Sequence, residues 1–199
     1  MEVIIALCLG IALSAACGFR VFMPPLAMSI AANYGGFNLS PELAWLGSYP
    51  AMIVLAVAVI VEILAYYIPV VDNLLDLIEI PTAITVGTVL TAANLGDIDP
   101  VLQWSLAVIA GGGTAGIIES ATSMTRLAST SMTGGIGNIF LATMEALSAA
   151  VLSILALTLP LLAAGLVIGL LIFAIAKLIK LGPSLFRKLK RLIFGHPSN

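Results

Sequence analysis

Among the charged side chains inside apolar stretches of this chain, four could bind or carry an ion where the lipid offers no polar groups. They are Arg20, Glu62, Glu119 and Arg126. A charged side chain at the centre of a bilayer costs at least about 2.5–3.5 kcal/mol, so each needs a partner, water or a place near the membrane surface. An arginine can bind an anion, and a glutamate can carry a proton or a cation. We therefore expect either a polar pathway for an ionic solute or a buried ion pair that only holds helices together.

Two further acids follow a proline at the end of the stretch EILAYYIPVVDNLLD, which runs from residue 62 to residue 76. Asp72 and Asp76 are four residues apart, so on a helix they share one face. Two carboxylates this close favour a proton or a cation between them. The pair predicts the mouth of a pathway that leads to Glu62. The alternative interpretation is a solvated cytoplasmic loop that caps the next span.

The composition indicates that lipid surrounds these residues. Hydrophobic residues make up 61 % of the 199 and charged residues 9 %, with a mean hydropathy of +1.17. A soluble domain is about 45–50 % apolar and about 25 % charged. We predict an all-α integral membrane protein with about six transmembrane helices. The apolar stretches that would form them cover 3–32, 45–69, 82–95, 102–132, 136–159 and 161–181.

Several glycines and prolines mark places where these helices should break. The first and fourth stretches each have about 30 residues, or about 45 Å of helix, which exceeds the thickness of the hydrocarbon layer. We expect both to be discontinuous or re-entrant, or else tilted helices with long ends. The expected breaks lie at Gly18, Pro24 and Pro25 in the first stretch, at Gly111, Gly112 and Gly113 in the fourth, and at Pro69 and Pro160 elsewhere.

The two halves of the chain resemble each other. VEILAYYIPVV at 61–71 aligns with LSILALTLPLL at 152–162, and Arg20 falls on Glu119 at a slightly larger offset. Three spans per half would insert the second copy upside down, as in secondary transporters that place their site at the repeat interface. We predict repeats over about 3–95 and 102–181. Glu119 would then be the partner of Arg20.

The basic residues predict the orientation of the chain. Six of the eight lysines and arginines follow residue 176, and such residues keep the adjacent loop in the cytoplasm. With six spans, both termini are expected on the cytoplasmic side of the inner (plasma) membrane. We predict one transmembrane domain over 1–181 and a basic amphipathic tail over 182–199 that binds anionic lipid.

Several classes of function lack their motifs in this sequence. There is no phosphate-binding glycine loop, no metal-ligand cluster and a single histidine, His196. The hydroxyl-rich run SATSMTRLASTSMT at 120–133 has no histidine nearby to activate a nucleophile. Such hydroxyls often bond to the backbone of their own helix. We expect no enzyme, no cofactor, no metal and no nucleic-acid partner.

Two segments carry a family resemblance. GFRVFMPPL at 18–26 and EILAYYIPVVDNLLD at 62–76 resemble the bacterial membrane family known as domain of unknown function 4126. The resemblance extends over nearly the whole chain to about residue 180. It implies a multi-span inner-membrane protein and brings no activity with it.

Three functional hypotheses follow from these residues. The leading one is a transporter or channel-like protein, expected to be a homo-oligomer, that moves a small ionic solute with protons or a cation as the coupling ion. A related version moves a lipid phosphate held by Arg20 and Arg126. The third is a scaffold or assembly protein in which the same charges lock the helices and nothing is transported.

Overall fold

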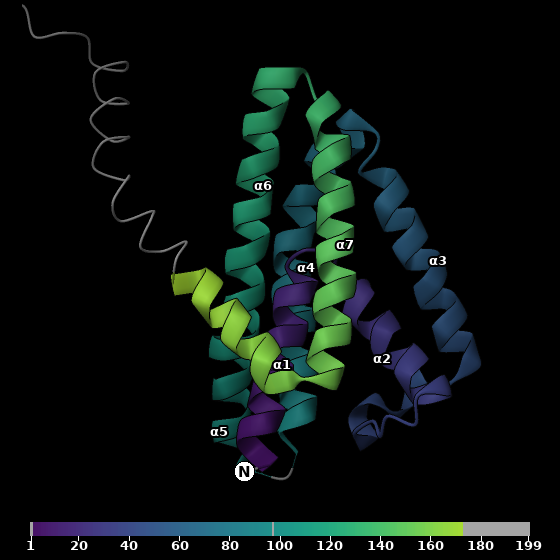
Figure 1. The fold of residues 1–199 in the computed structure, drawn as a ribbon, viewed down its shortest axis with the longest axis vertical. Coiled ribbons are helices and arrows are strands. Elements are labelled where there is room, and N and C mark those ends of the chain that lie inside the picture. Colours follow the sequence, from purple (N-terminus) through teal and green to yellow (C-terminus); the bar gives the residue numbers. More distant parts are fainter. Residues whose placement is uncertain (1, 97, 173–199) are drawn as a thin grey trace, which may run out of the picture. The chain divides into compact units, whose positions relative to one another are not determined.

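A computed structural model describes residues 2–96 and 98–172 of the chain, and all regular structure among them is helical (Figure 1). The all-α prediction is therefore confirmed for these residues. The chain divides into two compact units, Met1–Ala164 and Gly165–Asn199. The elements, which all belong to the first unit, are α1 (Glu2–Cys17), α2 (Met23–Tyr34), the 3₁₀ helix η1 (Pro41–Gly47), α3 (Tyr49–Ala65), α4 (Pro69–Leu95), α5 (Pro100–Leu106), the π-helical η2 (Ala107–Gly112), α6 (Gly113–Thr133) and α7 (Ile136–Thr158). One more helix, Pro160–Ile172, runs into the second unit.

Apolar helices of membrane-spanning length support the prediction of a membrane protein. Among the described residues, three segments are long and apolar enough to cross a bilayer: Ile78–Leu95, Pro100–Thr133 and Ile136–Thr158. The pair η1 and α3, which bends by 78°, makes a fourth if it counts as one span. α1 and the helix Pro160–Ile172 are apolar but shorter. Six spans and an inverted repeat are therefore not confirmed and stay predictions.

The first apolar stretch is broken. α1 ends at Cys17 and α2 begins at Met23, so residues 18–22 form a link between two short helices. Pro24 and Pro25 lie in the first turn of α2, where a missing backbone N–H costs nothing because it has no helical partner. Gly18 allows a close approach, since a Cβ there would lie 2.6 Å from a backbone oxygen of α6.

The fourth stretch differs from the expectation of a break at three glycines. Residues 100–133 form one continuous helical segment that widens to a π-helix over Ala107–Gly112. The glycines bring this segment close to α4. A Cβ on Gly111 would collide with the hydroxyl of Thr91 and lie 2.7 Å from the carbonyl oxygen of Gly87. Here glycine serves close helix packing, and the segment is neither broken nor re-entrant at this point.

Pro69 and Pro160, the other two prolines at which a break was expected, stand at helix starts. α4 begins at Pro69, with three residues between it and the end of α3 at Ala65, and Pro160 begins the helix that follows α7. Proline is common at this position because its fixed φ already suits the helix. Both prolines thus lie where one helix gives way to the next.

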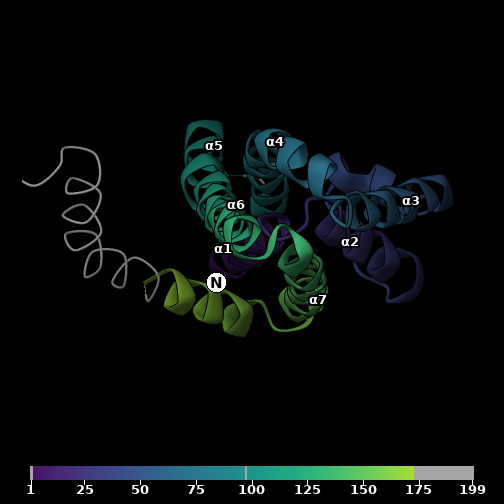
Figure 2. The ribbon, with the colours of Figure 1, turned by 90° about the horizontal axis from the view of Figure 1, so that it is seen from above.

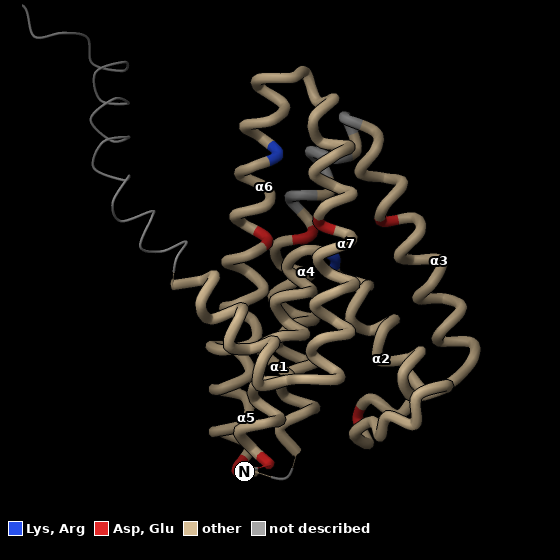
Figure 3. The backbone as a smooth tube through the Cα atoms, viewed as in Figure 1, with Lys and Arg blue, Asp and Glu red and all other residues tan. Residues whose placement is uncertain are grey.

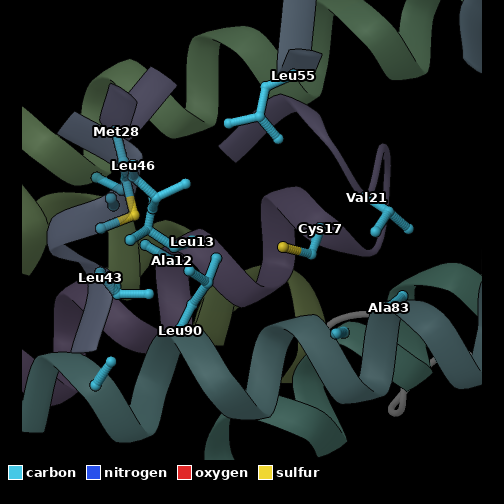
Figure 4. Close-up of a cluster of buried hydrophobic side chains, with 14 residues drawn as sticks. Ala12, Leu13, Cys17, Val21, Met28, Leu43, Leu46, Leu55, Ala83 and Leu90 are labelled. Atoms are coloured by element: carbon cyan, nitrogen blue, oxygen red, sulfur yellow. The ribbon is translucent and has the colours of Figure 1, made fainter. Parts of the chain in front are cut away.

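The interior of the first unit is built around α1. This helix packs against α4, α6 and α7, while α2 packs against α3, α7 and η1 (Figures 1 and 2). Small residues allow the close contact of α1 with α4, where the Ser14 hydroxyl donates to the Gly87 carbonyl at 2.8 Å and lies 3.0 Å from the hydroxyl of Thr91. Buried apolar side chains such as Leu13, Cys17 and Leu90 fill the same region (Figure 4).

Candidate functional site

Six charged side chains are buried within the part of the chain that the structure describes, and we call them the charged centre. They are Arg20, Glu62, Glu79, Glu119, Arg126 and Glu145. They come from the α1–α2 link and from α3, α4, α6 and α7. Their exposed fractions are 7 % or less, and those of Arg20 and Glu119 are 0 %. In Figure 3 acidic positions of several helices lie at a similar level along the helices rather than at their ends.

Glu145 on α7 joins both arginines. Its Oε2 lies 3.1 Å from Nη2 of Arg20 and 2.7 Å from Nη2 of Arg126, and its Oε1 accepts from Nε of Arg126 at 3.1 Å. Nη2 of Arg20 also donates to the carbonyl oxygen of Ala142 at 3.1 Å. The network ties the α1–α2 link to α6 and α7. Glu145, and not the predicted Glu119, is the ion-pair partner of Arg20.

Tyr66 lies against both guanidinium groups. The guanidinium carbon of Arg20 is 4.0 Å from the centroid of the tyrosine ring, and that of Arg126 is 4.1 Å away. Tyr66 is 1 % exposed and follows directly after α3. Its hydroxyl is within hydrogen-bonding reach of Glu79. An aromatic face stabilises a desolvated cation by about 2 kcal/mol or more, so this ring supports two buried positive charges.

Glu62 holds the break between α1 and α2. Its carboxylate accepts hydrogen bonds from the backbone N–H groups of Val21 at 2.7 Å and Phe22 at 3.4 Å. The first N–H groups of a helix have no partner within the helix, and a carboxylate at that end also complements the helix dipole. A residue predicted for the pathway therefore has a clear structural contact as well.

Glu79 and Glu119 complete the centre on α4 and α6. Oε1 of Glu119 accepts a hydrogen bond from the Ser123 hydroxyl at 3.1 Å. Oε2 of Glu79 is buried and has no hydrogen-bond partner among the described residues. Glu79 interacts electrostatically with Glu62, Glu119 and Arg20. The carboxyl group of Glu79 thus has one buried oxygen without a hydrogen bond from the described residues.

The charges of the centre do not balance. Four carboxyl groups face two guanidinium groups, so the described side chains carry two more negative than positive charges when all are ionised. An uncompensated charge in a membrane interior is costly, and the group tends to be neutralised instead. Protons or a bound cation would restore neutrality. No group of three or more metal-ligating residues occurs in the described part of the chain.

The structure leaves some of the predicted residues outside its description. The backbones of Asp72 and Asp76 lie in α4, four residues apart on one helix, but their side chains are outside the described residues, as is the predicted tail over 182–199. Hydroxyls in the run 120–133 bond to their own helix: Thr125 donates to the carbonyl of Ala121, and Ser131 to that of Leu127. These hydroxyls are therefore occupied locally.

Three residues of this site were not predicted from the sequence. Glu79 stands in what was interpreted as a polar break, and Tyr66 is an aromatic residue in an apolar context, which normally indicates packing. Glu145 is the one for which a signal existed, because it is the single acid of the apolar stretch over 136–159. Glu62 was selected by the same criterion, namely a charged residue inside an apolar stretch.

Two apolar grooves lie away from the charged centre. One of about 350 Å³ is lined by α2 and α7, through Leu26, Ile30 and Ile154 among others. The other, of about 210 Å³, is lined by residues of η1, α3, α4 and the start of α2. Neither lining includes a charged side chain, so these grooves suit lipid or apolar groups rather than ions.

The fold and the site define a membrane-embedded helical protein with a buried, net acidic centre. The chain belongs to the family described as Domain of unknown function (DUF4126), whose model matches residues 7–180. All six residues of the charged centre fall within the matched range. No curated protein and no solved structure matches the chain.

Proposed function

We propose that this protein is a membrane transporter or channel-like protein that moves a small cation, protons included, through the charged centre. One observation carries the proposal: carboxyl groups outnumber guanidinium groups in a buried site to which four helices and a helix break contribute. An acidic site in lipid attracts the positive charge it lacks. A helix break beside the site supplies the irregular backbone that transporters use at such places.

The contacts of the arginines favour a cation over an anionic solute or a lipid phosphate. Arg20 and Arg126 both already bind Glu145. Nε and Nη1 of Arg20 have no hydrogen-bond partner among the described residues, but a phosphate bound there would meet the negative charge of Glu145 and of the other three carboxyl groups. The lipid-phosphate hypothesis therefore has less support than cation transport.

A non-transporting scaffold is the second candidate, and the Arg20–Glu145–Arg126 network favours it. These three groups are directly hydrogen-bonded and link separate elements, as a purely structural ion network would. In this case the charged centre determines which helices pair and carries nothing. Six spans, an inner-membrane location, cytoplasmic termini, a homo-oligomer and a tail bound to anionic lipid stay predictions under either function.

Flux through reconstituted protein separates the two candidates. Proteoliposomes with an internal pH dye, or with dyes for sodium and potassium, would be given a negative internal potential. We expect cation uptake by the wild type and at least a tenfold loss in Glu119→Gln. Glu42→Gln is the matched control, because Glu42 lies on η1 and is exposed. If folded wild-type protein takes up neither protons nor sodium nor potassium, the proposal is contradicted.

A further inference from the structure

We propose that the transported or coupling ion is the proton and that Glu79 is the residue that carries it, with the Tyr66 hydroxyl as its hydrogen-bond partner. This inference rests on the proposed function and names the ion and its site. Glu79 differs from Glu62 and Glu145 in the hydrogen bonds that its carboxyl group makes.

Two of the carboxyl groups have a hydrogen-bond donor on each oxygen. Glu145 receives three hydrogen bonds from the guanidinium groups of Arg20 and Arg126. Glu62 receives two from the backbone N–H groups at the start of α2. Charge-assisted bonds from guanidinium groups and backbone N–H bonds to a carboxylate both favour its ionised state. Both oxygens of each group are therefore already hydrogen-bonded to donors.

Glu79 is held much less firmly. Its side chain is buried, with 7 % of the residue exposed, and Oε2 has no hydrogen-bond partner within the described ranges. A buried carboxylate oxygen without a donor is costly, whereas a protonated oxygen carries no charge and can itself donate. The geometry therefore suits an oxygen that binds and releases a proton.

The surroundings of Glu79 are acidic. Glu62 from α3 and Glu119 from α6 interact with it electrostatically, and Tyr66 interacts both electrostatically and through its hydroxyl. Arg20, from the α1–α2 link, is the positive group that acts on it, and that guanidinium already shares its charge with Glu145. On α4 itself the side chains of Asp72 and Asp76 are outside the described residues. Two like charges near one carboxyl favour its neutral form.

A proton fits this site better than a metal cation. Hard cations such as Ca²⁺ take six or more oxygen ligands. In the segments that the structure describes, no three acidic, histidine or cysteine side chains converge in that way. A proton needs only one oxygen. It would arrive from water on one side, form an O–H bond at Oε2 and remove one negative charge, and its release to the other side would restore the carboxylate.

Infrared difference spectroscopy of the reconstituted full chain tests this assignment without reference to flux. Between acidic and alkaline buffer, the wild type and Glu42→Gln should show the carbonyl band of a protonated buried carboxyl group. Glu79→Gln should lose that band. A band that persists unchanged in folded Glu79→Gln would overturn the assignment.

A second variant covers the case in which Glu79→Gln does not fold. Tyr66→Phe keeps the ring against both guanidinium groups and removes only the hydroxyl. The band should then shift to higher frequency, because the carboxyl group loses a hydrogen bond. An unshifted band would argue against Glu79 and Tyr66 as the proton site.

Failure of this inference can be told from failure of the proposed function. Loss of the band in Glu79→Gln together with no cation flux in the wild type would keep the proton site and reject transport. Proton flux that survives in Glu79→Gln, with the band intact, would keep transport and reject Glu79. Flux of sodium or potassium without proton movement would also overturn the assignment.

Discussion

At the scale of single residues, Glu145 forms ion pairs with two buried arginines, Arg20 and Arg126. Glu145→Gln keeps the shape of the side chain and removes its charge. Breaking a buried ion pair by removing one partner costs about 3–5 kcal/mol. We expect the free energy of unfolding, measured in detergent micelles, to fall by about that amount. Glu42→Gln should leave it within about 0.5 kcal/mol, as surface changes usually do. Equal stability of the two variants would contradict the network.

Tyr66 offers a second test at this scale, because its ring and its hydroxyl have separate roles. Tyr66→Leu removes the aromatic face from Arg20 and Arg126, and each desolvated cation–π contact is worth about 2 kcal/mol. We expect it to lower the free energy of unfolding by at least about 2 kcal/mol. Tyr66→Phe should lose less than half as much. If both variants are equally destabilised, the ring contacts contribute little.

The sequence predicted part of the charged centre. A charged residue inside an apolar stretch can be recognised from the sequence alone, and the structure buries all four residues selected in this way. Their partners could not be assigned, since pairing depends on how helices rotate against each other. Arg20 was matched with Glu119 through a sequence offset, while the fold brings Glu145 to it over a separation of 125 residues. Tyr66 gave no signal, because nothing in an aromatic residue shows that two guanidinium groups will lie on it.

At the scale of elements, glycines determine how closely α4 and the segment η2–α6 approach. Gly111→Ala would place a methyl group on the Thr91 hydroxyl and 2.7 Å from the Gly87 carbonyl oxygen. Overpacking of this kind costs about 1–3 kcal/mol. Gly113→Ala is the matched control, because its Cβ would meet nothing closer than 3.9 Å.

Thermal unfolding in detergent measures the difference between these two variants. Gly111→Ala should unfold at a clearly lower temperature than the wild type. Gly113→Ala should be unchanged or slightly more stable, since alanine favours a helix over glycine by up to about 1 kcal/mol. A stable Gly111→Ala protein would show that α4 and η2 are not in close contact.

Helix breaks were only partly predictable from their residue types. The prolines at which a break was expected lie in the first turn of a helix, although Pro81 lies inside α4, and the link around Gly18 does separate α1 from α2. The glycines at 111–113 have the same composition signal as a break but lie in a continuous helix. Glycine permits both a break and close packing, and only the neighbouring helix decides between them.

At the scale of the whole molecule, composition alone predicted a helical membrane protein, and the described residues agree with it. The number of spans was harder to predict from the sequence. Several apolar stretches fold as short helices: α1 has 16 residues and α2 has 12. Apolar length in sequence does not distinguish one long helix from two short ones. Five of the six charged residues of the centre lie within helices and Arg20 lies in the α1–α2 link, so the chain buries a charged centre without any long polar segment.

The central claim is that water reaches the charged centre, because an ion cannot pass through a site that is sealed. Ser123 is 7 % exposed and lies beside Glu119, so a cysteine at this position would report access to the centre. The native thiols Cys8 and Cys17 would first be replaced by alanine. A cationic thiol reagent that does not cross membranes would then be applied to proteoliposomes.

We predict that the reagent modifies Ser123→Cys and that modification blocks cation uptake. Val151→Cys, on an exposed apolar position of α7, should stay unmodified because lipid covers it, and Ser48→Cys, at the start of α3, should react as a control for access. Reaction at position 48 without any reaction at position 123 would contradict the account, because the centre would then be a sealed structural ion network.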